Sequence, residues 1–288
     1  MTFRCGVVLL LCASAAAADS PSVPDLIAQL RDEDPEVRIA AREALRDAGG
    51  LARPELTKLA AAGDGSVNRG AKSLLLQIDF DDRVKSALAG GDAWFRWERS
   101  GKAKAWVRLS AKPKTGAERG YTLTETLFME DVTLTQVAET DRDLAVSSVR
   151  CTLSSGGDKV ETSATFADGL CHFEADGLKH EMTAPGVPLT DWSVVRFAAA
   201  FAANPLKEPE IVVWDSTDSE PATTNMRVGG EVVVDGPGGS VRAMPVKVEG
   251  LLIAYVTADG KLSHATHGEG SVVVPVKTQD VPAEVRKK

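Results

Sequence analysis

The sequence predicts an α+β protein in which a small α-solenoid of helix pairs precedes a large antiparallel β domain with one buried helix. Three observations carry this prediction. Apolar residues recur at helical spacing through residues 21–79. From residue 91 to residue 280 they instead alternate with polar residues, and glycine-containing turns separate the runs. One helical pattern, at residues 190–203, interrupts this second region.

The composition is that of an ordinary globular protein. The chain has 288 residues, of which 43% are hydrophobic and 26% are charged, and its net charge is -8. This apolar content can form a core without metals or a dense set of disulfides. The acidic balance, with no basic stripe, argues against a nucleic-acid partner, because nucleic-acid-binding proteins cluster Lys and Arg on one face.

Residues 1–18 have the pattern of a secretory signal peptide, with a positive residue, a short apolar run and then small residues. The apolar run is shorter than the ~20 residues that span a bilayer, so we expect no transmembrane segment. Cleavage is expected after Ala18, which makes the mature protein periplasmic or secreted. Cys12 follows the bulky Leu11, which departs from the lipoprotein pattern, so we expect no lipid anchor there.

Two successive helix pairs are predicted within residues 21–79. Asp34-Pro35-Glu36 is a helix start signal, and Gly49-Gly50 is a stop signal. A helix pair that recurs at a fixed period is the signature of an α-solenoid. The matched positions, each 30 residues apart, are Leu26 and Leu56, Leu30 and Ala60, Asp34 and Asp64, Val37 and Val67, Ala41 and Ala71, Ala44 and Leu74, and Leu45 and Leu75.

The segment Leu-Arg-Asp-Glu-Asp-Pro-Glu-Val-Arg-Ile-Ala-Ala-Arg-Glu-Ala-Leu, residues 30–45, resembles the HEAT-type repeat in its short bacterial form. The second copy is degenerate, because it lacks the proline. The resemblance assigns residues 19–90 to a module of two repeats, with residues 80–88 as a further helix that caps it. It implies a surface for a protein partner and no chemistry.

Alternating runs predict two strand meanders, one on each side of the lone helix. Thr190 can cap this helix and Asn204-Pro205 stops it, and its nearly continuous apolar surface predicts that it is enclosed. Residues 281–288 form a charged tail. The expected strands are residues 94–99, 104–110, 121–129, 132–139, 144–153, 159–166 and 170–175, and then 210–215, 225–235, 240–249, 252–257, 261–267 and 271–277.

This order of elements, with Trp94-Phe95-Arg96-Trp97 before a Ser100-Gly101 turn and Ala258-Asp259-Gly260-Lys261-Leu262 near the end, resembles a family of exported β-rich domains of unknown function. Those domains are similar to the lipoprotein-carrier half-barrels. The resemblance implies a curved antiparallel sheet or half-barrel with the helix in its concave side. It also implies binding of an apolar ligand, a lipid or an envelope component, and no catalytic activity.

Aromatic residues are the candidate ligand-binding residues. Phe95 and Trp97 share one face of a predicted strand, and with Trp106 they could line a concave sheet. Three more aromatic residues on the helix either plug the sheet or face a cavity. Plain core packing is the alternative for the whole set, which comprises Phe95, Trp97, Trp106, Trp192, Phe197 and Phe201.

Cys151 and Cys171 remain after loss of the signal peptide and are candidates for a disulfide. Two turns separate them, which places them on the first and third strands of a simple meander. Such strands lie about 9.5 Å apart, whereas a disulfide needs Cα atoms within ~7 Å. The bond therefore requires that residues 159–166 be displaced from between them, and both outcomes stay open.

No motif for catalysis, a cofactor or a metal is found. His264 and His267 are three residues apart, and on a strand they point to opposite faces. A Gly-x-Ser-x-Gly motif is absent, and the glycine-rich residues 236–239 open no helix. We therefore predict a non-enzymatic exported protein that binds an apolar ligand in its β domain and a protein partner through its repeats. The alternatives are a purely structural scaffold and a hydrolase with an unrecognised site.

Overall fold

The computed structural model describes residues 21–287 except residues 64, 116–118, 176, 208–209, 216–219 and 269. The expected signal peptide, residues 1–18, lies outside the described residues. The chain divides into two compact units, one up to Leu75 and one from Leu76 onward. None of the helices in the described part has both the length and the apolar content needed to cross a bilayer.

The first unit consists of two helix pairs. Asp34 caps the second helix, because its carboxylate accepts a hydrogen bond of 2.8 Å from the backbone N–H of Glu36. Leu26 and its match Leu56 are both buried, as are Ala41 and Ala71. The 30-residue spacing thus marks equivalent core positions. The elements are α1 (Val23–Gln29), α2 (Pro35–Ala48), the 3₁₀ turn Gly49–Leu51, α3 (Arg53–Ala61) and the first part of α4 (Ser66–Ala89).

Helix α4 runs unbroken for 24 residues. The expectation of a separate capping helix at residues 80–88 is therefore wrong, since no glycine or proline lies between residues 71 and 89. The C-terminal part of α4 belongs to the second unit, where Phe80 packs edge-on against Phe201 with ring centroids 5.7 Å apart.

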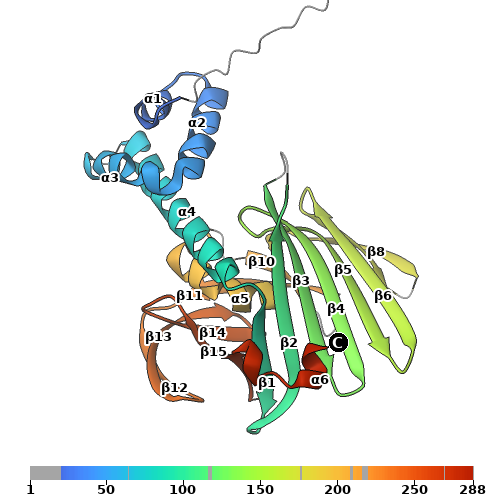
Figure 1. Cartoon of the computed structure of the whole chain (residues 1–288). Coiled ribbons are helices and arrows are strands. Elements are labelled where there is room, and N and C mark those ends of the chain that lie inside the picture. The colour runs from blue at the N-terminus through green and yellow to red at the C-terminus, as the bar shows by residue number, and fades with distance from the viewer. Residues whose placement is uncertain are drawn as a thin grey trace, which may run out of the picture. The chain divides into compact units, whose positions relative to one another are not determined.

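The second unit contains a curved, unclosed and almost entirely antiparallel sheet (Figure 1). The strand order is β8-β7-β6-β5-β4-β3-β2-β1-β16-β15-β14-β13-β11-β10-β9, and β12 pairs with β13. The described strands are β1 (Ala93–Arg99), β2 (Lys102–Pro113), β3 (Gly120–Met129), β4 (Val132–Asp141), β5 (Val146–Ser155), β6 (Asp158–Ala167), β7 (Leu170–Ala175), β8 (Leu178–Thr183), β9 (Val187–Thr190), β10 (Glu210–Asp215), β11 (Glu220–Val228), β12 (Val232–Gly236), β13 (Gly239–Val248), β14 (Leu252–Thr257), β15 (Leu262–His267) and β16 (Ser271–Val276).

The α+β fold class is confirmed, with a meander, a helix and a second meander in the predicted order. The expected strand 225–235 is instead two strands, because Gly229-Gly230 separates β11 from β12. Strands β8 and β9 were not expected. Pro188 lies within β9, which pairs in parallel with β10 and ends the strand order. An edge strand tolerates proline, because the missing N–H can lie on the side that has no neighbouring strand.

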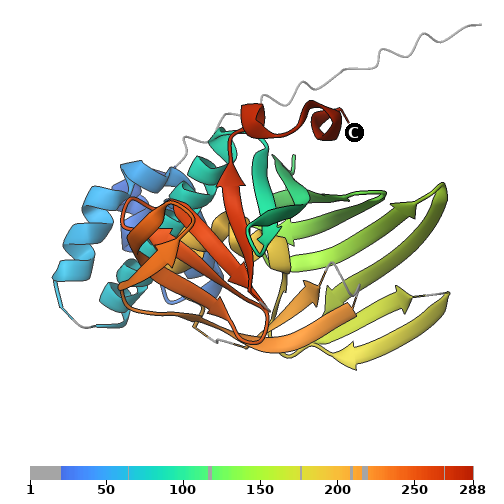
Figure 2. The same ribbon diagram turned by 90° about the horizontal axis from the view of Figure 1, so that it is seen from below.

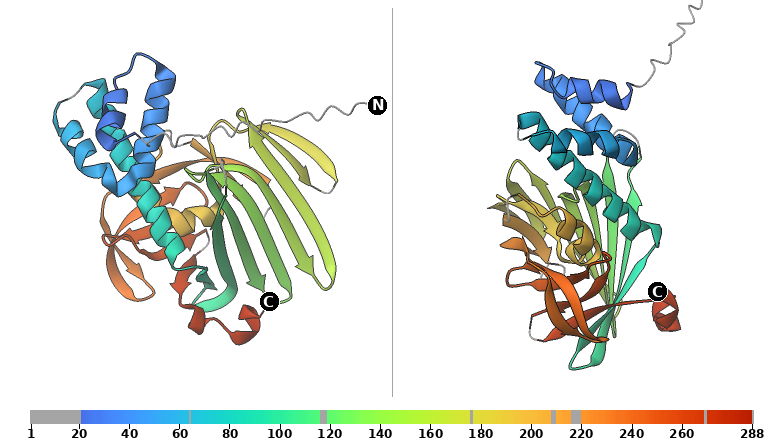
Figure 3. Two further views of the ribbon diagram at one scale, coloured as in Figure 1. Left: turned by 45° about the horizontal axis from the view of Figure 1, so that its top comes forward. Right: turned by 90° about the vertical axis from the view of Figure 1, so that its left-hand side faces the viewer.

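Helix α5 (Asp191–Ala203) is the enclosed helix that the sequence predicts. Ten of its 13 residues are buried, and Thr190 and Ser193 form a capping box at its start. Figure 2 shows α5 between the two halves of the sheet, and the left view of Figure 3 shows β3–β8 fanning away from it. We call the face of the sheet that packs against α5 the inner face, and the opposite face the outer face.

Candidate functional site

The best candidate site is a groove of about 450 Å³ on the outer face of β2 and β3. We call it the outer groove. Its volume falls within the ~300–1,000 Å³ typical of small-molecule sites. Five apolar side chains line it together with three charged side chains, which are exposed. The lining residues are Ala103, Lys104, Trp106, Phe128, Met129, Glu130, Glu284 and Val285.

Strand register places Trp106 in this groove. Trp106 is paired with Arg96 of β1 and with Phe128 of β3, so these three side chains form one row on the outer face. Phe95 precedes Arg96 and Val107 follows Trp106. These two residues pair with each other and point into the main core. The period of two along a strand thus separates the groove from the core.

A stacked aromatic pair forms the wall behind the groove. The rings of Trp94 and Phe128 are 5.9 Å apart and inclined by 21°. The guanidinium carbon of Arg108 lies 5.7 Å from the Trp94 ring and 5.8 Å from the Phe128 ring, which is cation–π geometry. Because Trp94 and Phe128 are both buried, this wall is held in place by packing.

The C-terminal segment completes the groove. Val281 is buried against Trp94 and Phe128, and Val285 packs on the same cluster. The segment forms a 3₁₀ turn (Thr278–Asp280) and α6 (Ala283–Arg286). Within the expected charged tail, residues 281–288, Val281 is thus an apolar anchor.

The six predicted ligand-binding residues lie in two places. Trp106 lies in the outer groove, whereas the other five belong to the main core or pack on it. Phe95 packs against Trp192 with ring centroids 6.4 Å apart, and half-buried Trp97 contacts His267 edge-on. The residues on the inner face are Phe95, Trp97, Trp192, Phe197 and Phe201.

The expectation that Trp106 shares a face with Phe95 and Trp97 is wrong. The pairing of β1 and β2 sets Trp97 opposite Ala105, so Trp106 falls on the other face. A change of one residue in register moves every side chain to the opposite face, and the hairpin sequence alone does not specify that register. The space beside Trp192 amounts to about 10 Å³, room for about one water, so these aromatic residues fill the core.

A buried carboxylate, which sequence reasoning missed, anchors the start of α5. Glu125 of β3 accepts a hydrogen bond of 2.6 Å from the Thr190 hydroxyl and another from the side-chain amide of Gln136. Burial raises the pKa of Glu125 to about 7, against the lowering effect of these hydrogen bonds. Its signal in the sequence was a charged residue at an inward position of an alternating strand, between Leu123 and Leu127.

Arg196 anchors the middle of the same helix. Its guanidinium donates hydrogen bonds to the backbone carbonyls of Leu109 and Gly91, the latter at 2.8 Å. Burial lowers the pKa of Arg196, while the negative charges of Asp92 and Glu125 oppose that shift. Glu125 and Arg196 both bond to other elements of the protein, so we assign this cluster to positioning α5.

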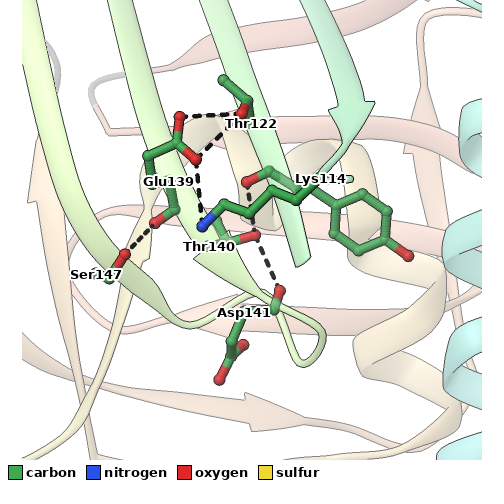
Figure 4. A network of polar contacts seen from close by, with 7 residues as sticks. Lys114, Thr122, Glu139, Thr140, Asp141 and Ser147 are labelled. Carbon is green, nitrogen blue, oxygen red and sulfur yellow. Dashed lines mark hydrogen bonds and ion pairs between the residues drawn. The ribbon is translucent and has the colours of Figure 1, made fainter. Parts of the chain in front are cut away.

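A polar network at the end of β3–β5 is also structural (Figure 4). The Glu139 carboxylate accepts hydrogen bonds from the Thr122 hydroxyl at 3.0 Å and forms an ion pair of 3.2 Å with Lys114. The Thr140 hydroxyl donates to the backbone carbonyls of Tyr121 and Asp141. The bonds from Thr122 to Glu139 and from Thr140 to Tyr121 join β3 and β4 at this end of the sheet.

The histidines and cysteines do not assemble into a reactive centre. His264 is buried and stacks on Tyr255, and burial lowers its pKa, whereas His267 contacts Trp97. Within the described ranges, no group of three His, Cys, Asp or Glu side chains could hold a metal ion.

Cys151 and Cys171 are both buried thiols in the structure. They lie on β5 and β7 with β6 between them, in the simple meander. Cys151 pairs with Thr162 of β6 and Cys171 pairs with Phe166, so the two are also offset by four residues along that strand. Burial raises the pKa of Cys171 to about 11, which keeps it protonated at neutral pH.

No protein-family model matches the chain, and no curated protein matches it in sequence. Among solved structures, the chain is similar to the crystal structure of a beta-barrel-like protein of the domain of unknown function DUF1849 from Brucella abortus. That protein is 14% identical with a TM-score of 0.40, over 65% of this chain and 94% of the other.

Proposed function

We propose that this chain is a non-enzymatic exported protein that binds an apolar ligand, such as the acyl chain of a lipid, in the outer groove. The observation that carries the proposal is half-buried Trp106, which lies beside Phe128 and Met129 in a groove of about 450 Å³. A groove of this size that combines an aromatic residue with a few charged groups is typical of small-molecule sites. Export rests on the signal pattern of residues 1–18.

The chemistry of the lining supports an amphiphilic ligand. Trp106, Phe128, Met129 and Val285 offer apolar and aromatic contacts, whereas Lys104 and two glutamates stand at the rim. An apolar chain on this floor would gain about 25 cal/mol of binding free energy for each Å² of apolar surface that it buries. The polar end of the ligand would remain near the rim, where one ammonium and two carboxylates meet water.

Titration of the full chain with a dansyl-labelled fatty acid tests the proposal. We expect saturable enhancement of dansyl fluorescence, and we expect Trp106→Ala to weaken binding at least about tenfold through loss of aromatic contact area. Phe173→Ala is the matched control, since Phe173 is also a half-buried aromatic residue but lies on the inner face of β7. An unchanged affinity in Trp106→Ala, or no binding by the wild-type protein, would contradict the proposal.

A second candidate function is protein recognition by the helical unit, which its resemblance to HEAT-type repeats supports. Two large apolar side chains of this unit stand in solvent, Ile39 at 61% exposure and Leu51 at 81%. A photo-crosslinking residue at Leu51 of the full chain should give one discrete adduct in the native envelope. The same residue at exposed Lys58 of α3 is the control, and equal adducts at both positions would rule against a specific contact.

A further inference from the structure

Strand β8 is a free edge of the sheet. It ends the strand order and, among the described residues, pairs only with β7 (Figure 1). The far side of β8 therefore presents a row of backbone N–H and C=O groups that can extend the sheet. Leu178 at its start is 63% exposed, which is unusual for a leucine within a strand.

The side chains of β8 are sorted between the two faces of the sheet. Met182 pairs with buried Cys171, so Met182 and Leu178, four residues away on the same strand, belong to the inner face. Lys179 and Glu181 belong to the outer face, where a carboxylate oxygen of Glu181 lies 3.2 Å from Nδ1 of His172. The inner face thus carries Leu178 and Met182 on either side of His180, and the outer face carries both signs of charge.

This arrangement is complementary to itself. In an antiparallel pairing of two β8 strands about a two-fold axis at His180, Leu178 of one copy faces Met182 of the partner subunit. In the same register Lys179 faces Glu181 of the partner subunit, and the symmetry creates each contact twice. On the inner face, Leu178 and Met182 therefore meet on both sides of a central pair of His180 side chains, and opposite charges meet on the outer face.

The exposed edge strand β12 lacks this property. A two-fold axis at its central residue, Val234, would set Val233 opposite Asp235 and Val232 opposite Gly236. That pairing gives neither an opposite-charge pair nor a pair of large apolar side chains. Self-pairing is therefore favoured at β8 over β12.

We propose that two copies of this chain pair antiparallel along β8, in the register centred on His180, to form a dimer with one continuous sheet. The dimer would cover exposed Leu178 and complete the backbone hydrogen bonds of the free edge. This inference goes beyond ligand binding and does not depend on the outer groove, which lies at β2 and β3.

Sedimentation of the full chain tests the dimer through charge reversal. Lys179→Glu and Glu181→Lys each replace two attractive pairs with two repulsive pairs, so each should weaken dimerisation at least about tenfold. The double variant Lys179→Glu/Glu181→Lys restores opposite charges and should dimerise again. An equimolar mixture of the two single variants should form a heterodimer, which also shows that neither variant is misfolded.

Lys159→Glu is the matched control, because Lys159 is exposed on β6 and forms an ion pair of 2.5 Å with Glu161 in its own strand. It makes the same change in net charge as Lys179→Glu and should leave dimerisation unchanged. A wild-type protein that stays monomeric at ~100 μM, far above the micromolar Kd of a weak specific complex, would overturn the proposal. A dimer that is indifferent to all the reversals would overturn it as well.

Discussion

The hydroxyl of Thr190, the N-cap residue of α5, donates a hydrogen bond of 2.6 Å to Glu125, a buried carboxylate in the middle of β3. The single helix inside the sheet is thus held at its start by an acid whose pKa burial raises to about 7. The Oε1 atom of the neighbouring Gln136 has no hydrogen-bond partner in the described part of the chain. A protonated Glu125 could donate to that oxygen after a flip of the amide.

The first prediction is that stability falls as the pH rises from about 5 to about 8. The folded pKa of Glu125, about 7, lies above its ordinary value of 4.5, so between these values the folded protein holds a proton that the unfolded chain has lost. The stabilising contribution is therefore complete below pH 4.5 and is lost as the pH rises through 7. It amounts to about 3 kcal/mol at 1.36 kcal/mol per pKa unit.

Urea unfolding of the wild type and of Glu125→Gln at pH 5 and pH 8 checks this prediction. The glutamine cannot ionise, so the loss of stability between the two pH values should be about 3 kcal/mol smaller in the variant. Equal pH dependence in the two proteins would show that Glu125 is ionised throughout this range.

The second prediction concerns the packing of α5. Phe201 is fully buried and packs against Phe80 of α4, so Phe201→Ala should lower the free energy of unfolding by about 3–5 kcal/mol. Phe173→Ala, at a half-buried aromatic residue of β7, should cost less because solvent can fill the space left. Urea unfolding at one pH compares the two variants, and a loss below about 1 kcal/mol for Phe201→Ala would contradict the enclosed helix.

The third prediction is that the C-terminal anchor supports the outer groove. Val281→Asp would place a charge against Trp94 and Phe128, so the anchored segment should detach and withdraw Val285 from the lining. Binding of the dansyl-labelled fatty acid should weaken about tenfold, equivalent to ~1.4 kcal/mol. Far-ultraviolet circular dichroism should stay near that of the wild type.

Val233→Asp is the control for that experiment, because Val233 is an exposed valine on β12. It should bind the fatty acid like the wild type. If Val281→Asp also binds like the wild type, the C-terminal segment is not part of the site.

The fourth prediction concerns Gly120, at the start of β3. Its φ of +152° lies in the positive region, and a Cβ atom there would overlap the backbone carbonyl of Thr140. Gly120→Ala should therefore destabilise the protein by more than about 3 kcal/mol, measured by urea unfolding. Gly268→Ala, where a Cβ meets no atom within 4 Å, should change stability by less than about 1 kcal/mol.

The sequence by itself determined most of the elements of this protein, because their signals are local. Apolar periodicity and turn residues predicted the helix pairs, the two meanders and α5 with its Thr190 cap. The two meanders could be read one strand at a time, since each strand pairs with its neighbour across a short turn. These signals need no knowledge of distant contacts.

Only the tertiary structure decided which face of a strand becomes core and which becomes site. The pairing of β1 with β16 joins residues at opposite ends of the domain, and no local pattern specifies it. The register of β1 and β2 moved Trp106 from the predicted inner floor to the outer groove, where Val281 and Val285 meet it. The physical reason is that neighbouring residues of a strand point to opposite faces, so a shift of one position in pairing exchanges core and surface.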